Sequence, residues 1–130
     1  MKILVTGSEG SLMQAVIPHL LAAGHTVRGV DSFFRYGKIE RARAYELVTG
    51  DLTDPAFARE VCKGCEGLIQ AAARIFGVGG FHKSPADILA HDLTLHQNVL
   101  WGALGIALLA YAESIAAARK FAQQSGYEVD

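Results

Sequence analysis

Two glycines near the start of the chain have the spacing of a turn that binds phosphate. The chain opens with the apolar run MKILV, and Gly7 and Gly10 follow it in the segment TGSEGS. Glycine adopts backbone angles that are closed to other residues, and it lets the main chain approach a ligand closely. A helix that begins near Ser11 would point its free amides and the positive end of its dipole at a phosphate. We expect a dinucleotide site here, although any tight turn from a strand to a helix can also use glycine.

An acidic residue follows the next apolar run. Asp31 comes directly after residues 26–30, which predict a second strand. A carboxylate about 20 residues past a glycine turn can accept hydrogen bonds from both hydroxyls of an adenosine ribose. It favours NAD over NADP, because it would repel a 2′-phosphate. Arg35 and Lys38 follow closely and weaken this preference.

Length and composition limit the class of protein. The chain has 130 residues, of which 51% are hydrophobic, and its formal net charge is -1. This length suits one domain over residues 1–130, but it is short for an enzyme that holds a dinucleotide and a second substrate. The composition argues against a disordered tail and against an electrostatic nucleic-acid binder. We expect the rest of an enzyme to be missing or to come from a partner.

Nothing in the sequence predicts a membrane, redox or metal function. The strand-like start leaves no room for a signal peptide, which predicts a cytoplasmic protein. The apolar segment at residues 104–112 is too short to span a bilayer. Cys62 and Cys65 are predicted to be free, partly buried thiols, because the pair closes a helix instead of opening one. The histidines lack paired spacing, so no metal site is predicted.

Hydrophobic patterns predict four strands, at residues 1–5, 26–30, 45–48 and 67–73. The last run is apolar on both faces, which is typical of a parallel sheet. Alternation with helical segments predicts an α/β fold. We expect a Rossmann-like parallel sheet in the order 3-2-1-4 with helices on both faces, truncated after the fourth strand and followed by a long C-terminal helical region.

Three helical segments connect or follow these strands. Residues 11–23 have apolar side chains at helical spacing. Asp54 before Pro55 is typical of a helix start, and the helix should run to about residue 63. After Pro85 the chain is expected to be helical to about residue 125, with breaks near Gly102 and Gly105 and a stop at Gly126.

Five short motifs stand in an order that resembles a known family. They are Thr6-Gly-x-x-Gly10, Asp31, Gly50-Asp51-Leu52, Ala71-Ala72-Ala73 and Asn98-Val99. In this order they resemble the N-terminal part of an extended short-chain dehydrogenase/reductase, from the group of NAD-dependent epimerases and dehydratases that act on nucleotide sugars. The resemblance covers about residues 1–110. The loop at residues 77–80, with Pro85-Ala-Asp87, further resembles the GDP-sugar epimerase and reductase branch.

The resemblance implies a place for each motif around the cofactor. The two glycines would approach the pyrophosphate, Asp31 would hold the ribose, and Asp51 with Leu52 would frame the adenine. The three alanines would line the nicotinamide side. Asn98 matches the family's structural asparagine, or it is an ordinary polar residue of a helix. The residues predicted at the cofactor are Gly7, Gly10, Ser11, Leu12, Asp31, Ser32, Arg35, Asp51, Leu52, Ala71, Ala72, Ala73 and Asn98.

Aromatic and basic residues occur in two of the predicted loops. Phe33, Phe34 and Tyr36 would flank an adenine ring or cover the edge of the sheet. Arg74, His82 and Lys83 would contact a substrate phosphate or remain solvated. The residues alone do not decide between these alternatives.

The chain departs from the family pattern at two points. The third glycine of the family is replaced by Met13, where close packing favours the smallest side chain, and this puts cofactor affinity in doubt. The family's chemistry uses a Tyr-x-x-x-Lys pair, whose lysine lowers the pKa of the phenol so that it can exchange a proton with a sugar hydroxyl. None of the four tyrosines has a lysine four residues later. We predict no catalytic residue, and a chain that binds cofactor without turning over substrate.

The sequence therefore predicts the NAD-binding portion of a nucleotide-sugar epimerase, dehydratase or reductase. Its alternative is a non-catalytic dinucleotide-binding or regulatory module, and a third option is a degenerate scaffold that binds nothing. A sheet that stops at its fourth strand leaves an apolar edge unpaired. We expect a homodimer in which the C-terminal helical region covers this edge or exchanges between copies.

Overall fold

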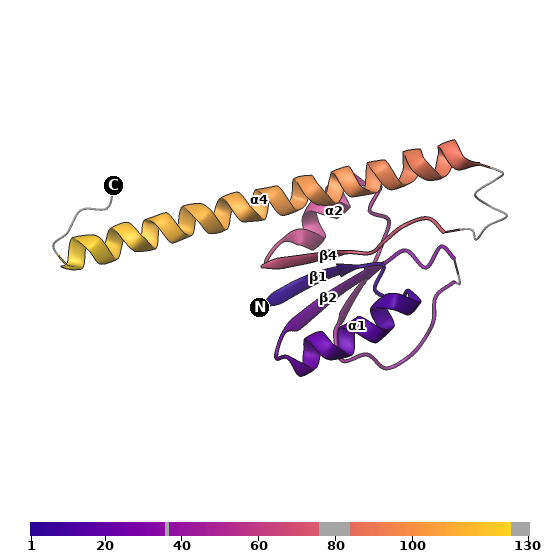
Figure 1. Cartoon of the computed structure of the whole chain (residues 1–130), viewed down its shortest axis with the longest axis horizontal. Coiled ribbons are helices and arrows are strands. Elements are labelled where there is room, and N and C mark those ends of the chain that lie inside the picture. Colours follow the sequence, from indigo (N-terminus) through magenta and orange to yellow (C-terminus); the bar gives the residue numbers. More distant parts are fainter. Residues whose placement is uncertain (36, 76–83, 126–130) are drawn as a thin grey trace.

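A four-stranded parallel sheet forms the centre of the molecule (Figure 1). The computed structural model describes residues 1–35, 37–75 and 84–125. The strands are β1 (Lys2–Thr6), β2 (Thr26–Asp31), β3 (Glu46–Thr49) and β4 (Gly67–Gln70), and they pair in the order β3-β2-β1-β4. The predicted sheet and its order are confirmed. Because Thr6 pairs with both Val30 and Gln70, the carboxyl ends of three neighbouring strands lie together.

Helices cover both faces of the sheet, as predicted. The first, α1 (Ser11–Ala22), lies on one face, and α2 (Pro55–Cys62) and α4 (Pro85–Ser125) lie on the other (Figure 1). Side chains alternate along β1, so Ile3 and Val5 pack on the α1 side, whereas Leu4 packs on the α2 side. The α1 side also buries Met13, Ile17 and Val27; the α2 side buries Val30, Leu52, Ala58, Val61, Cys62, Cys65, Leu95 and Val99.

The strand bounds differ from the sequence prediction by one residue in β1, β2 and β3, and by three residues at the end of β4. The strand β3 begins at Glu46, and the ring of the preceding Tyr45 lies against Gly29, where an added β-carbon would lie 2.5 Å from Tyr45 Cε2. The strand β4 ends at Gln70 instead of residue 73. After Gln70 the strand pairing stops, and the amides of Ala71 and Ala72 both donate to Thr6 Oγ1 at 3.1 Å.

The start of α2 has the predicted cap. Asp54 Oδ1 accepts hydrogen bonds from the amides of Ala56 at 2.8 Å and Phe57 at 3.4 Å. Pro55 occupies the first helical position, where its missing amide costs nothing. This helix end is therefore closed by a carboxylate of its own chain.

The helix α4 is continuous, so the breaks predicted at Gly102 and Gly105 are wrong. Gly102 has a packing role: an added β-carbon would lie 2.7 Å from Cys62 Sγ and 3.3 Å from the carbonyl oxygen of Ala58. The glycine thus lets α4 approach α2 closely without leaving the helical conformation. The stop predicted at Gly126 lies outside the described residues.

The C-terminal half of α4 extends beyond the sheet (Figure 1). Large apolar side chains along the helix are exposed, and they include Leu100, Trp101, Leu104, Leu108, Tyr111 and Phe121. Within the part of the chain that the structure describes, no helix is both long and apolar enough to cross a membrane.

The two cysteines are free and buried, which confirms the prediction for them. Cys62 is the last residue of α2, and Cys65 lies in the turn that leads to β4. Burial raises the pKa of both thiols, so they are protonated and unreactive at neutral pH.

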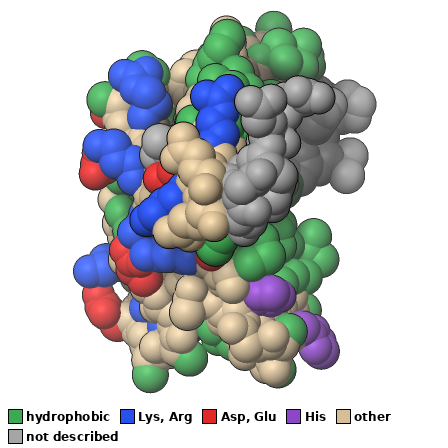
Figure 2. Space-filling model, turned by 90° about the vertical axis from the view of Figure 1, so that its left-hand side faces the viewer, with side chains coloured by type: hydrophobic (Ala, Val, Ile, Leu, Met, Phe, Trp, Pro, Cys, Tyr) green, Lys and Arg blue, Asp and Glu red, His purple; other side chains and the backbone are tan. Residues whose placement is uncertain are grey.

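Charged side chains of both signs are mixed on the surface. On the face seen in Figure 2, Lys and Arg lie beside Asp and Glu. Glu46, for example, pairs with Lys2 at 2.9 Å and with Arg28 at 3.0 Å. Such mixing matches the small net charge and gives this face no extended basic stripe.

Candidate functional site

The turn after β1 can be formed only by a glycine at its first position. Gly7 has a φ of 63°, and an added β-carbon would lie 2.9 Å from the carbonyl oxygen of Ala71 and from the backbone of Ala72. The turn is closed by the amide of Gly10, which donates to the Gly7 carbonyl at 2.9 Å. Both the backbone angle and the close approach therefore exclude larger residues at Gly7.

The N-terminus of α1 is left open. Gly10 is the residue before the helix and offers no side chain to accept a hydrogen bond, and no acidic residue lies in the first turn. The first bond between helical turns joins the amide of Gln14 to the Gly10 carbonyl at 3.0 Å. The amides of Ser11 to Met13 are thus available to an anion, which the helix dipole also attracts.

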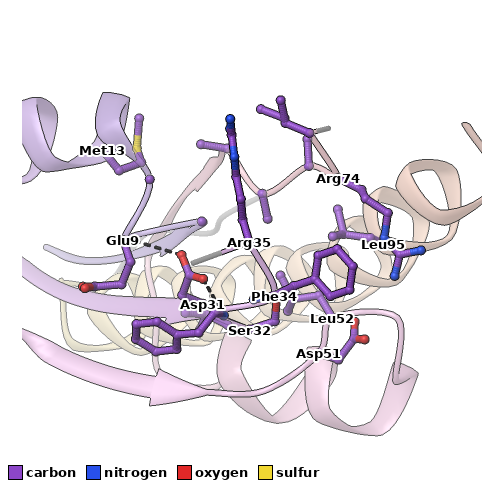
Figure 3. A pocket seen from close by; sticks show the side chains of 18 of the residues that line it. Glu9, Met13, Asp31, Ser32, Phe34, Arg35, Asp51, Leu52, Arg74 and Leu95 are labelled. Carbon is purple, nitrogen blue, oxygen red and sulfur yellow. Dashed lines mark hydrogen bonds between the residues drawn. The ribbon is translucent and has the colours of Figure 1, made fainter. Parts of the chain in front are cut away.

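Asp31 ends β2 and connects two backbone segments. Its Oδ2 accepts from the amide of Glu9 at 3.0 Å, and its Oδ1 accepts from the amide of Phe33 at 2.8 Å (Figure 3). The second bond stabilises Phe33 in a left-handed conformation, with a φ of 55°. A carboxylate has about four acceptor positions, so Asp31 can still accept hydroxyl groups of a ligand.

These elements surround one cleft of about 660 Å³ at the carboxyl ends of the strands. Twelve of the residues predicted at the cofactor line it: Gly7, Gly10, Ser11, Leu12, Asp31, Ser32, Arg35, Asp51, Leu52, Ala71, Ala72 and Ala73. The cleft also includes residues that the sequence did not indicate for this role, among them Glu9, Ile39, Ile75, His91 and Leu95. A volume in this range is typical of pockets for small molecules and cofactors.

The wall beside β4 is held by Thr6. Its hydroxyl donates to Gln70 Oε1 at 2.7 Å and accepts the amides of Ala71 and Ala72. Thr6 is fully buried. This bonding presents small side chains to the cleft, on which a flat ring could lie.

Asp51 lies in the loop after β3, at the other side of the cleft. Burial disfavours its ionised form, but the hydrogen bonds from Thr53 and the nearby charges of His91 and Arg74 outweigh this effect, and the pKa of Asp51 lies below its ordinary value. Asp51 is therefore ionised at neutral pH and can accept hydrogen bonds from a base or a sugar.

A cation–π contact links the loops that follow β2 and β4. The Arg74 guanidinium lies 4.7 Å from the centre of the Phe34 ring, and both residues line the cleft (Figure 3). The amide of Arg74 donates to Asp92 Oδ1 at 2.8 Å. Phe34 is 63% exposed, whereas Phe33 is buried. The third aromatic residue of this predicted group, Tyr36, lies outside the described residues. The other two residues of the predicted basic loop, His82 and Lys83, lie outside the described residues.

Glu9 is a cleft residue that the sequence analysis missed. Its carboxylate is 4% exposed and accepts hydrogen bonds from Arg43 at 2.7 and 2.9 Å, from Arg41 at 2.8 Å and from the Tyr45 hydroxyl. The bonds from Arg43 hold the pKa of Glu9 at about 2, against the opposing effect of burial. No spacing in the sequence pairs Glu9 with residues so far along the chain.

A family model described as the NAD dependent epimerase/dehydratase family matches residues 3–127. The chain belongs to this family. The resemblance noted from the sequence is thus confirmed, with the chain corresponding to the N-terminal portion of its relatives. A search of curated proteins gave no match.

Solved structures share the fold of this epimerase/dehydratase family member. The UDP-glucose 4-epimerase of Thermotoga maritima, solved with UDP-glucose, has a TM-score of 0.71 and 23% identity, over 81% of this chain and 34% of that chain. A short-chain dehydrogenase/reductase superfamily protein of Agrobacterium tumefaciens with bound NAD has a TM-score of 0.60 and 26% identity, over 79% of this chain and 29% of that one. The chain spans about a third of the length of these structures.

The family's structural asparagine has a matching residue that does not line the cleft. Asn98 Nδ2 donates to the carbonyl oxygens of Leu52 at 3.0 Å and Thr53 at 2.9 Å. Asn98 therefore fixes the loop that carries Asp51 and Leu52 to the wall of the cleft, and any effect on a ligand passes through that loop.

The family's third glycine is replaced by a methionine that faces the core. Met13 is 4% exposed and packs with Val5 and Ile17, and it also contributes to the cleft wall. The helix α1 begins at Ser11 despite this larger side chain. Its effect on cofactor affinity stays a prediction.

Proposed function

We propose that this chain is the NAD-binding portion of an oxidoreductase of the epimerase/dehydratase type, acting on a nucleotide sugar. The observation that carries the proposal is that the open N-terminus of α1 and the carboxylate of Asp31 line one cleft. The first attracts a pyrophosphate and the second accepts ribose hydroxyls, and a dinucleotide joins these two groups.

Each part of NAD would contact a different part of the cleft. The pyrophosphate would lie over Gly7 and Gly10, against the amides of Ser11 and Leu12. The adenosine ribose would contact Asp31 and Ser32, beside Arg35. The adenine would lie by Asp51 and Leu52, on the loop that Asn98 holds, and the nicotinamide would lie by Ala71, Ala72 and Ala73. NAD when bound supplies the acceptor for a hydride.

Calorimetric titration of the purified chain with NAD, and in parallel with NADP, tests this proposal. We expect saturable NAD binding, weaker NADP binding, and a loss of at least about tenfold in NAD affinity in Asp31→Ala, because a charged hydrogen-bond partner of the ribose is removed. Asp54→Asn is the matched control, since this aspartate caps α2 outside the cleft. Absence of NAD binding by the unaltered chain would refute the proposal.

A second candidate is a non-catalytic dinucleotide-binding or regulatory module. Residues 1–130 contain no Tyr-x-x-x-Lys pair, so the enzyme would need one further along its chain and the module would not. The reading frame of the gene distinguishes the two: continuation beyond residue 130 into such a pair favours the enzyme, and a stop codon favours the module. Both candidates require the same NAD site.

We further infer a homodimer that forms through the exposed apolar side chains of α4. Leu104 and Leu108 are one helical turn apart and are 46% and 61% exposed. Sedimentation should show a dimer whose fraction rises with concentration, and Leu104→Glu with Leu108→Glu should yield a monomer. A monomer at every concentration of the unaltered chain would contradict this inference.

The cytoplasmic location, the organisation as a single domain and the GDP-sugar branch stay predictions. The loop at residues 77–80, on which the last of these depends, lies outside the described residues.

A further inference from the structure

We propose that Glu9 is a specificity-determining residue, which keeps Arg41 and Arg43 away from the ribose end of the cleft and so disfavours NADP. This inference rests on the proposed NAD site. It concerns a residue on the glycine turn, separate from the acidic residue at the end of β2 from which the sequence predicted NAD.

The main chain and the side chain of Glu9 serve different parts of the molecule. Its amide donates to Asp31 Oδ2 at 3.0 Å, so its backbone forms the wall beside the predicted ribose position. Its side chain is directed away from Asp31 (Figure 3) and is 4% exposed. Glu9 lines the cleft, whereas the two arginines that it binds do not.

Each nitrogen of the Arg43 guanidinium donates at least one hydrogen bond in this arrangement. Nε and Nη2 donate to the Glu9 carboxylate, Nη1 donates to the carbonyl oxygen of Arg41 at 2.9 Å, and Nη2 also donates to the carbonyl oxygen of Ile39 at 2.6 Å. The loop between β2 and β3 is thus folded around one guanidinium. Ile39, from the same loop, lines the cleft.

Gly29 on β2 leaves room for Tyr45, one of the partners of Glu9. An added β-carbon on Gly29 would lie 2.5 Å from the Tyr45 ring and 2.7 Å from Ser8 Oγ. Because Gly29 leaves this space, Tyr45 lies over β2 and its hydroxyl reaches Glu9. The carboxylate thus has three protein partners in a pocket that fits it.

The pairs of Glu9 with Arg41 and Arg43 bear on the binding of the 2′-phosphate of NADP. Guanidinium groups bind phosphate through paired hydrogen bonds, and an arginine near the ribose is the usual partner of the NADP 2′-phosphate. Glu9 pairs with two such groups, through Nη2 of Arg41 and through Nε and Nη2 of Arg43. A 2′-phosphate would then meet the carboxylate of Asp31 without a compensating cation from Arg41 or Arg43.

The variant Glu9→Gln tests the effect on specificity. Glutamine keeps the shape of the side chain but loses its charge, so it cannot hold both arginines, and we expect the ratio of the NADP to the NAD dissociation constant to fall by about tenfold. Glu40→Gln is the matched control: it removes one carboxylate from the loop that carries both arginines, where Glu40 is exposed and pairs with Lys38. Arg35 is unchanged in both variants. Adding both Arg41→Met and Arg43→Met to Glu9→Gln should restore the original ratio.

Limited digestion with trypsin tests the placement of the arginines without any cofactor. Cleavage after Arg41 and Arg43 should be faster in Glu9→Gln than in the unaltered chain or in Glu40→Gln. Equal cleavage rates, or an unchanged ratio of dissociation constants with NAD binding retained, would overturn the inference about Glu9 alone. Absence of NAD binding by the unaltered chain would instead overturn the proposed function and, with it, the specificity.

Discussion

The N-termini of α1 and α2 follow two parallel strands of the same sheet, yet only α2 has a side chain that caps its first amides. The helix α2 begins after Asp54, whose carboxylate accepts two of its first amides, and Pro55 removes another donor. The helix α1 begins after Gly10, which offers no side chain, and its first turn contains no acidic residue. One end is closed by the protein, and the other is left open.

This difference separates a structural helix end from a ligand-binding one. A capping side chain stabilises a helix by about 1 kcal/mol, and α1 forgoes this contribution. Its open amides border the cleft that also contains Asp31. A helix without a capping side chain therefore indicates a ligand site when its N-terminus lies at the carboxyl ends of parallel strands, where ligands of this fold class bind.

The largest effect is expected from changing the turn that opens α1. Gly7→Ala should lower the free energy of unfolding by about 3 kcal/mol or more, since the left-handed conformation penalises a β-carbon and the backbone of Ala71 and Ala72 must move. Gly24→Ala is the control, because Gly24 has a φ of 81° but nothing within 4 Å of an added β-carbon. Denaturant unfolding of both variants measures the difference. Equal losses would show that close approach at Gly7 has no cost.

The ion pairs of Glu9 should make the stability of the folded chain depend on pH. The pKa of Glu9 falls from 4.5 in the unfolded chain to about 2 in the folded one, so its contribution is fully present above pH 4.5 and is lost as the pH falls toward 2. Glu9→Gln should therefore destabilise the chain by about 2 kcal/mol at pH 7. The gap between the two unfolding curves should close between pH 4.5 and 2; a constant gap would contradict the ion-pair explanation.

A carboxylate added to the open end should make α1 resemble α2. Ser11 is exposed in the first turn, so Ser11→Asp should stabilise the chain by about 0.5 kcal/mol through the helix dipole. The same charge should repel a pyrophosphate and weaken NAD binding by about tenfold. Calorimetry and thermal unfolding on the same samples test these opposite signs, with Ser11→Asn as the uncharged control. Unchanged NAD affinity would place the pyrophosphate elsewhere.

The smallest effect is expected from opening the closed end. Asp54→Ala should lower the free energy of unfolding by about 1 kcal/mol and leave NAD affinity unchanged, because the first amides of α2 do not border the cleft. Asp54→Asn should retain most of the cap. A loss of NAD affinity in Asp54→Ala beyond that caused by partial unfolding would break the distinction between the two helix ends.

Much of the fold could be predicted from local patterns. Apolar runs separated by helical segments predicted four strands, and right-handed connections with a glycine turn after the first strand predicted the order that the structure has. Asp54 before Pro55 predicted the start of α2 because capping depends on residues a few positions apart. The predicted breaks in α4 were wrong, because glycine lowers helix propensity but Gly102 is used for contact with Cys62.

Some cleft residues could likewise be predicted from local patterns, and others depend on contacts between distant parts of the chain. The sequence by itself determined the open turn at Gly7 and Gly10 and the carboxylate of Asp31, because backbone freedom and charge are properties of single residues in short motifs. Only the tertiary structure decided the role of Glu9, whose partners Arg41, Arg43 and Tyr45 lie more than thirty positions away. It also decided that Asn98 holds the loop of Leu52 instead of lining the cleft. Such contacts form only when strands and helices pack, and no local pattern encodes which distant side chains meet.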